Sequence, residues 1–256
     1  MGSPRVHLDR VVGGTGGRRG FTLIDLLVSI AVIAVLIAIA LPSLKLVHDT
    51  SRRVVCASNL RQVGLGIHMY ATENNSELPY SSYTHGDWGT DPMVIRMVAD
   101  VRGEYASWWD GLGVLYEQGY LSDGRIFYCP SHTGTHTFDT YADQFAGEQG
   151  EVLSNYGYRA QVLDDRGRPH DRLNQIVDSA ALVSDGFREI ADINHARGMN
   201  VLRAGMSVDW FADTTNWMLD TASQAGEGLD DPGWQERWRR LDHPTPTGGL
   251  FGGFFN

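Results

Sequence analysis

The sequence lacks the short motifs by which many enzymes and metalloproteins are recognised. Its nine histidines include no H-E-x-x-H spacing, and it has no G-x-S-x-G, Walker A or strand-linked G-x-G-x-x-G pattern. Only two cysteines occur, Cys56 and Cys129, and neither belongs to the C-x-x-C pair of a common zinc site. The sequence therefore predicts a protein that is not an enzyme and holds no cofactor.

Positive charge is also scarce, and it is unevenly placed. The 21 Lys and Arg residues are outnumbered by 31 Asp and Glu residues, so the net charge is −10 and no nucleic-acid partner is expected. The first twenty residues differ, because four arginines stand there against Asp9 alone. By the positive-inside rule, residues 1–20 are expected in the cytoplasm and the rest of the chain across the membrane.

A long apolar run follows this basic segment. From Phe21 to Leu41 the only polar residues are Thr22, Asp25 and Ser29. A helix of this length spans about 30 Å, the thickness of a hydrocarbon core. The run exceeds the apolar part of a secretory signal, and no A-x-A-like cleavage site closes it. It therefore predicts a retained membrane helix.

Gly20 followed by FTLIDLLVSIAVIAVLIAIALP resembles the class III signal of type IV prepilins. The resemblance implies cleavage between Gly20 and Phe21 by a prepilin peptidase and methylation of the new N-terminal Phe21. Pro42 stands at position 22 of the processed chain, where pilins commonly carry a helix-kinking proline. Asp25 stands at position five, where the family usually has Glu.

The physical chemistry of Asp25 agrees with a role in assembly. A carboxylate inside a membrane helix costs about 2.5 kcal/mol or more unless it is paired or lies near the headgroups. The partner expected in a filament is the Phe21 amine of an adjacent subunit. The alternative is a carboxylate that reaches the membrane interface without a partner.

The apolar helix is predicted to continue past Pro42 to about Thr72 as an amphipathic helix, because apolar residues recur at steps of three and four. The expected organisation has five parts: a cleaved leader (1–20), a membrane and assembly helix (21–42), its amphipathic continuation (43–75), a globular pilin-like domain (76–247) and a Gly/Phe-rich tail (248–256).

The globular domain is expected to be α+β, a small antiparallel β-sheet packed on the second half of the long helix. Short strands are predicted at 126–129, 156–158 and 180–184, and a hairpin at 200–204 and 207–210 with a type II′ turn at Gly205-Met206. Residues 108–116 are predicted to form a helix with an apolar face, and residues 234–241 to form a short amphipathic helix. The face would consist of Trp108, Trp109, Leu112, Leu115 and Tyr116.

Residues 56–70 and 108–131, the latter ending in Cys129-Pro130-Ser131, resemble a pilin-like group with the C-terminal signature H-x9-DG. In this chain nine residues follow His195, but Gly205-Met206 stands where the signature has Asp-Gly. Two interpretations of His195 and Asp185 stay open: a metal site, or hydrogen bonding that ties a loop to the sheet. Loop carboxylates bind calcium in some major pseudopilins, although no regular ligand spacing supports calcium here.

The two cysteines are expected to form a disulfide, Cys56–Cys129, because an even pair in a non-cytoplasmic compartment is most simply bonded. The alternative is two buried free thiols.

Together these features predict a structural subunit of a type IV pilus-like or type II secretion pseudopilus filament. Its expected partners are copies of itself or other pilin-like subunits, the prepilin peptidase and an inner-membrane assembly platform. Before assembly it would be a single-pass inner-membrane protein with a periplasmic or extracellular domain. The alternative is a monomeric, membrane-anchored periplasmic domain whose aromatic clusters, such as Trp108-Trp109, bind a glycan.

Overall fold

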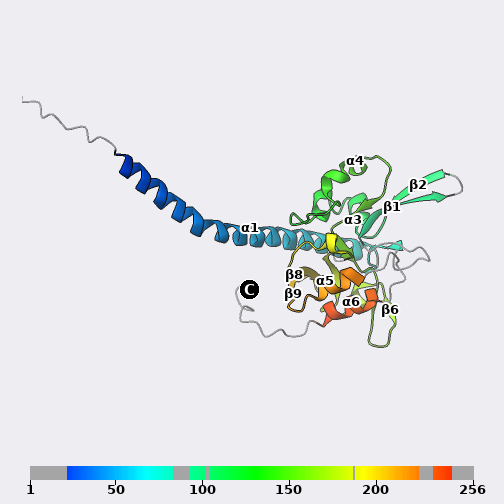
Figure 1. Cartoon of the computed structure of the whole chain (residues 1–256). Helices are drawn as coiled ribbons and strands as arrows, with labels where there is room; N and C mark the ends of the chain where they lie inside the picture. The colour runs from blue at the N-terminus through cyan, green and yellow to red at the C-terminus, as the bar shows by residue number, and fades with distance from the viewer. Residues whose placement is uncertain (1–21, 83–92, 102–103, 187, 225–232, 244–256) are drawn as a thin grey trace, which may run out of the picture. The chain divides into compact units, whose positions relative to one another are not determined.

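The computed structural model describes residues 22–82, 93–101, 104–186, 188–224 and 233–243, and is drawn in Figure 1. The chain divides into two compact units, residues 1–47 and 48–256. Helix α1 (Leu23–Glu73) contributes residues to both units, so its two parts are described separately.

In the first unit, Leu23–Leu41 is long and apolar enough to cross a membrane, and none of this segment is buried by the residues that the structure describes. The prediction of a membrane-spanning helix is confirmed at the level of length and composition. Gly20 and Phe21 lie outside the described residues, as does the leader before them.

In the second unit, one face of α1 is part of the core. Four residues at steps of four, three and four are completely buried, namely Cys56, Leu60, Val63 and Ile67. This spacing repeats with the 3.6-residue turn, so the four side chains share one face. Gly64 allows close approach, because a Cβ there would lie 2.9 Å from the Cδ1 atom of Leu202. Helix α1 thus continues to Glu73, with one buried face between Cys56 and Ile67.

The main sheet of the second unit has four antiparallel strands in the order β4-β7-β8-β9. They are β4 (Tyr156–Tyr158), β7 (Ala181–Asp185), β8 (Gly198–Arg203) and β9 (Val208–Ala212). A second sheet, in the order β2-β1-β3, contains β1 (Val94–Val101), β2 (Glu104–Trp109) and β3 (Val152–Leu153). A two-stranded ribbon pairs β5 (Val162–Leu163) with β6 (Pro169–His170).

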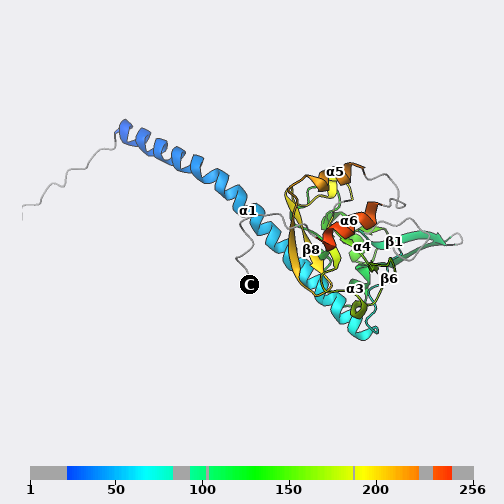
Figure 2. The same cartoon turned by 90° about the horizontal axis from the view of Figure 1, so that it is seen from below.

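Both faces of the main sheet are covered. Leu182 and Leu202 pack in the core that contains the buried face of α1. Ala181, Met199 and Val201 pack in a second core with residues of α5 (Trp217–Gln224) and α6 (Gly233–Asp242). Figure 2 shows α1 and the α5–α6 pair with the β8 strand between them. Because both faces of the sheet are covered, every residue of β8 is buried. The strand therefore lacks the alternation of buried and exposed residues that is typical of a half-exposed strand.

The remaining elements are short. The helices are α3 (Gly113–Glu117) and α4 (Ala142–Phe145), and the 3₁₀ turns are η1 (Gly124–Phe127), η2 (Phe138–Thr140), η3 (Leu173–Gln175) and η4 (Ile190–Asp192). The α+β class and the pilin-like arrangement of a long N-terminal helix with small antiparallel sheets are confirmed.

Two local predictions, for residues 108–116 and 126–129, are wrong. Trp108 and Trp109 end strand β2, where Trp109 pairs with Arg96, and the helix begins only at Gly113. Gly111 separates the two elements with a φ of +51°, a value that an α-helix does not admit. The strand predicted at 126–129 overlaps the 3₁₀ turn η1, which Asp123 caps by accepting a hydrogen bond from the backbone N of Arg125.

The predicted hairpin forms, but its turn differs. Arg203 exchanges backbone hydrogen bonds with Ser207 and Met206, so three residues occupy the loop. The positive φ of 66° falls on Met206, whereas Gly205 has none. This matches a three-residue loop whose last residue is left-handed, not a type II′ turn. The signature Gly of the resembled group would stand at Met206, the position where the left-handed backbone favours glycine.

Candidate functional site

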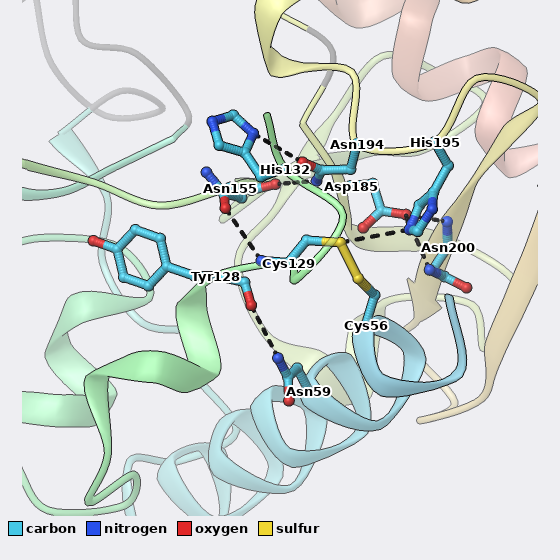
Figure 3. Close-up of a disulfide and its surroundings, with 10 residues drawn as sticks. All are labelled: Cys56, Asn59, Tyr128, Cys129, His132, Asn155, Asp185, Asn194, His195 and Asn200. Atoms are coloured by element: carbon cyan, nitrogen blue, oxygen red, sulfur yellow. Dashed lines mark hydrogen bonds and ion pairs between the residues drawn. A yellow bond between two sulfur atoms is a disulfide. The ribbon is translucent and has the colours of Figure 1, made fainter. Parts of the chain in front are cut away.

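A disulfide joins Cys56 on α1 to Cys129, which follows η1, and closes a sequence separation of 73 residues (Figure 3). The Cα atoms lie 5.1 Å apart, within the usual range for a disulfide. The predicted pairing is confirmed, and the free-thiol alternative is wrong. The bond fastens the helix to a loop that carries little regular structure.

Two asparagines hold the loop around Cys129. The Oδ1 atom of Asn155 accepts a hydrogen bond of 3.1 Å from the backbone N of Cys129. The Nδ2 atom of Asn59, one turn along α1 from Cys56, donates to the backbone O of Tyr128 at 3.1 Å. The disulfide therefore lies in a frame of side-chain to backbone hydrogen bonds that fixes its position between helix and loop.

Asp185 and His195 lie beside this disulfide (Figure 3). The Nε2 atom of His195 is 3.5 Å from the Sγ atom of Cys129 and 3.6 Å from the Oδ2 atom of Asp185. A disulfide sulfur carries no proton, so the imidazole is the only possible donor in the contact with sulfur. The 3.6 Å separation from the carboxylate is too long for a hydrogen bond.

The Asp185 carboxylate bonds to the neighbouring strand. Its Oδ2 atom accepts hydrogen bonds from the backbone N of Asn200, at 2.6 Å, and from the Asn200 side chain, at 3.0 Å. Its Oδ1 atom is buried and has no hydrogen-bond partner among the described residues. The carboxylate thus ties β7 to β8 through one oxygen and leaves the other available.

Burial sets the protonation of this pair. Asp185 is 1% exposed, and loss of water raises the pKa of its carboxyl to about 7, against partial compensation by the Asn200 hydrogen bonds. Burial also lowers the pKa of His195 to about 4, and the positive charge of Arg53 acts in the same direction. A histidine with this pKa is neutral at pH 7. Asp185 and His195 are therefore not an ion pair at neutral pH.

Arg53 and Trp210 close the other side of the histidine. The Arg53 guanidinium lies 3.6 Å from the centroid of the Trp210 ring, and the His195 ring meets Trp210 edge to face at 5.6 Å. These contacts fix the imidazole orientation.

Gly205 stands at the Asp position of the H-x9-DG signature, and no contact among the described residues joins it to Asp185 and His195. Gly205 lies in the β8–β9 loop, where its backbone N donates to the backbone O of Asp178 at 2.9 Å. A Cβ at Gly205 would lie 3.0 Å from that of Asp178, so an aspartate there requires a shift of the Asp178 segment. His195 and Asp185 come together, and Gly205 has a separate packing role.

Asp25 has a local partner that sequence reasoning overlooked. Thr22 and Asp25 form a reciprocal cap at the start of α1: the Asp25 carboxylate accepts from the backbone N of Thr22, and the backbone N of Asp25 donates to the Thr22 hydroxyl. The spacing of Thr22 and Asp25, S/T-x-x-D, resembles a helix-capping box and could have predicted this cap. Pro42 lies within the helical span of α1.

A groove of about 640 Å³ opens beside Cys129 and was not foreseen. Amides from Asn59, Gln62 and Asn155 line it together with Arg125 and Phe138. The lining residues are scattered between positions 55 and 155. No local sequence pattern could therefore have predicted the groove.

The aromatic residues predicted as a helix face are used mainly for packing. Trp109 packs with Tyr116 and Phe145 at centroid distances of 5.0 and 5.4 Å, and the Arg96 guanidinium lies 5.1 Å from its ring. Trp108 is 38% exposed.

His136, Glu189 and Asp192 form a second cluster of possible metal ligands. Arg188 already bonds to all three side chains, at 3.3, 3.0 and 3.0 Å. A cation in this position would compete with the guanidinium, so the cluster is better described as an ion-pair network.

Comparison with known families gives two matches. Residues 16–41 match the prokaryotic N-terminal methylation motif, and residues 48–192 match the family described as protein of unknown function (DUF1559). No curated protein and no solved structure matches the chain.

The first match covers Gly20, Phe21 and Asp25, and the second covers the disulfide and Asp185 but ends before His195. The methylation motif indicates a pilin-like processed protein that assembles into pilin-type complexes, and the Leu23–Leu41 helix is consistent with membrane anchoring. Because the second match spans more than half of its 256 residues, the chain belongs to the DUF1559 family and carries an N-terminal methylation motif.

Proposed function

We propose that the protein is a structural subunit of a type IV pilus-like or type II secretion pseudopilus filament. The observation that carries the proposal is the methylation motif over 16–41. It coincides with an apolar helix, Leu23–Leu41, that is fully exposed in the described part of the chain. Such a surface is satisfied by lipid before assembly and by neighbouring helices afterwards.

In this proposal a prepilin peptidase cuts between Gly20 and Phe21 and Phe21 is methylated. The five parts keep the bounds given by the sequence: leader 1–20, assembly helix 21–42, continuation 43–75, globular domain 76–247 and tail 248–256. The partners are pilin-like subunits and an inner-membrane assembly platform, and the globular domain lies in the periplasm or outside the cell.

N-terminal mass spectrometry of the protein purified from its native membrane tests the processing step. The expected result is a chain that begins with N-methylated Phe21. An intact Met1, or a cut at another bond, would contradict the proposal.

Asp25 is proposed to pair with the Phe21 amine of an adjacent subunit. Its carboxylate is held at the helix start by Thr22, close along the chain to the amine that cleavage would create. In a low-dielectric helix bundle, an unpaired charge is far costlier than a paired one. Asp25 therefore sets the register of one subunit against the next.

Asp25→Ala should abolish filament assembly and leave membrane insertion unchanged, as measured by fractionation and electron microscopy. Ser29→Ala is the matched control, because Ser29 is the next polar residue of the segment and its hydroxyl donates to the backbone O of Asp25 within the same helix. Intact filaments in Asp25→Ala would refute the pairing.

The groove beside Cys129 favours one alternative, a monomeric membrane-anchored domain that binds a glycan. Amide side chains with an aromatic wall are suited to hydroxyl-rich ligands, and the Arg125 guanidinium lies 4.5 Å from the Phe138 ring. Calorimetric titration of the full chain in detergent with soluble cell-wall oligosaccharides tests it. Binding that Phe138→Ala removes would support this function, and heat-silent titrations would oppose it.

A further inference from the structure

The four side chains around the disulfide have the composition of a zinc site. Cys56, Cys129, Asp185 and His195 each offer one ligand atom, and these atoms all lie within 4.8 Å of one another. Two thiolates, one imidazole and one carboxylate are all ligand types that Zn²⁺ accepts in tetrahedral geometry. The four residues do not form a recognisable sequence motif, because they are spread over 140 residues. They come from α1, the loop after η1, β7 and the segment before β8.

We propose that the site is redox-controlled: the oxidised chain holds the Cys56–Cys129 disulfide, and the reduced chain binds one Zn²⁺ through Cys56, Cys129, Asp185 and His195. A dithiol reductant would cleave the disulfide and become oxidised itself, leaving two cysteine thiols on this chain. Zinc binding then releases both thiol protons to solvent. Oxidation of the two thiolates by a disulfide acceptor reforms the bond and frees the metal.

The Asp185 carboxylate has one oxygen atom, Oδ1, that could bind a metal ion. Asn200 occupies only the Oδ2 atom of Asp185, and the buried Oδ1 atom has no hydrogen-bond partner among the described residues. An unpartnered carboxylate oxygen that is cut off from water costs free energy, so a cation is the kind of ligand it favours. Asn200 acts as the supporting group that holds the carboxylate in place.

The imidazole is also in position. His195 directs its Nε2 atom at both the Cys129 sulfur and the Asp185 carboxylate, at 3.5 and 3.6 Å. In a tetrahedral site with zinc–ligand distances of about 2.0–2.3 Å, ligand atoms lie about 3.3–3.8 Å apart. The two spacings already match this range, so the main rearrangement is the separation of the two sulfurs after reduction. Trp210 holds the ring in its orientation.

The charges around the site and the groove beside Cys129 are both compatible with a bound divalent cation. Two thiolates and a carboxylate carry three negative charges, and Zn²⁺ supplies two positive charges. Arg53 supplies the third, since its guanidinium interacts electrostatically with Asp185. Cys129 is one of the residues that line the 640 Å³ groove, so the groove is the expected approach for reductant and metal.

Cobalt binding to the full chain in detergent tests the proposal, because Co²⁺ reports thiolate coordination by a charge-transfer band and tetrahedral geometry by intense visible bands. The chain is first stripped of metal and reduced with a phosphine. The phosphine takes an oxygen atom from water and becomes phosphine oxide, while the disulfide accepts two electrons and the two water protons to give two thiols. The expected result is one Co²⁺ per reduced chain with both spectral features, displaced by Zn²⁺, and no thiolate band in the oxidised chain.

His195→Asn and Asp185→Asn keep both cysteines, so they separate ligation from disulfide formation. Each should weaken Co²⁺ binding by the reduced chain at least about tenfold and change the visible bands. His68→Asn, which alters an exposed histidine on the same helix as Cys56, is the matched control and should bind as wild type does. Circular dichroism before and after metal addition records whether the reduced chain is folded.

Two results would overturn the inference. One is a reduced chain with no thiolate-to-cobalt band. The other is thiolate binding of equal strength in wild type and His195→Asn, which would indicate adventitious binding by two free thiols, whether or not reduction had unfolded the chain.

Discussion

The two parts of helix α1 place apolar side chains in opposite environments. In Leu23–Leu41 apolar residues occur on every side and all of them are exposed within the chain, whereas after residue 55 one face is completely buried and the others are polar or partly exposed. A helix that is apolar all round needs a surrounding of lipid or other helices, and a helix with one apolar face needs a single packed domain. One continuous helix thus serves two different surroundings.

The largest expected effect concerns the covalent link in the second part. Replacing Cys56 and Cys129 together by alanine should lower the free energy of unfolding of residues 48–256 by about 4 kcal/mol, because the disulfide closes a loop of 73 residues in the unfolded chain. Urea denaturation of the full chain in detergent, followed by tryptophan fluorescence, measures the loss. An unchanged midpoint would mean that the loop is held by its hydrogen bonds alone.

A matched pair of substitutions tests the comparison directly. Leu60 is 0% exposed and Leu36 is 61% exposed on the same helix. Leu60→Ala should destabilise the domain by about 2–5 kcal/mol through lost burial and the cavity left behind, whereas Leu36→Ala should change it by less than about 0.5 kcal/mol. The same denaturation measurement compares them. Equal effects of the two substitutions would contradict the division of the helix.

The buried pair beside the disulfide should give opposite pH dependences when separated. The pKa of Asp185 is raised from 3.8 to about 7 on folding, so its contribution to stability falls as pH rises from about 4 to 7. The pKa of His195 is lowered from 6.5 to about 4, so its contribution rises as pH rises from about 4 to 6.5. In the wild type the two trends largely offset each other.

Single variants expose each trend. With Asp185→Asn, stability should increase between pH 4 and 6.5, and with His195→Asn it should decrease between pH 4 and 7, each by about 3–4 kcal/mol. The double variant provides the baseline for every other group in the chain. The charges of Arg53 and Asp49, which also act on His195, stay present in all four proteins. Slopes of the same sign in the two single variants would contradict the opposite pKa shifts of Asp185 and His195.

The smallest effect is expected at the start of the first part. Thr22→Val removes the hydroxyl that caps α1 and should raise amide hydrogen exchange in the first helical turn about fivefold, equivalent to about 1 kcal/mol. The stability of residues 48–256 should not change. Thr72→Val is a suitable control, because the Thr72 hydroxyl donates to a carbonyl within the helix and caps nothing at residue 22.

The candidate site shows where sequence reasoning stops. Cys56 and Cys129 could be paired from number and compartment alone, but their proximity to Asp185 and His195 depends on β7, β8 and the loop after η1 packing against one helix face. The orphaned Oδ1 atom of Asp185 and the groove beside Cys129 are products of side-chain packing, and neither has a local pattern. The Thr22–Asp25 cap could have been predicted from the spacing of the two residues, but it was not.

The sequence by itself determined the long helix, its change from all-round to one-sided apolarity, the α+β class and the strands at 156–158 and 180–184. These follow from composition and periodicity, which act over a few residues and leave a direct trace in the chain. Only the tertiary structure decided that Trp108 and Trp109 end a strand, that the β8–β9 turn places its left-handed residue at Met206, and that four distant side chains meet at one disulfide. Those outcomes depend on pairing and burial between segments far apart in the sequence, where the free energy of the whole domain outweighs local preference.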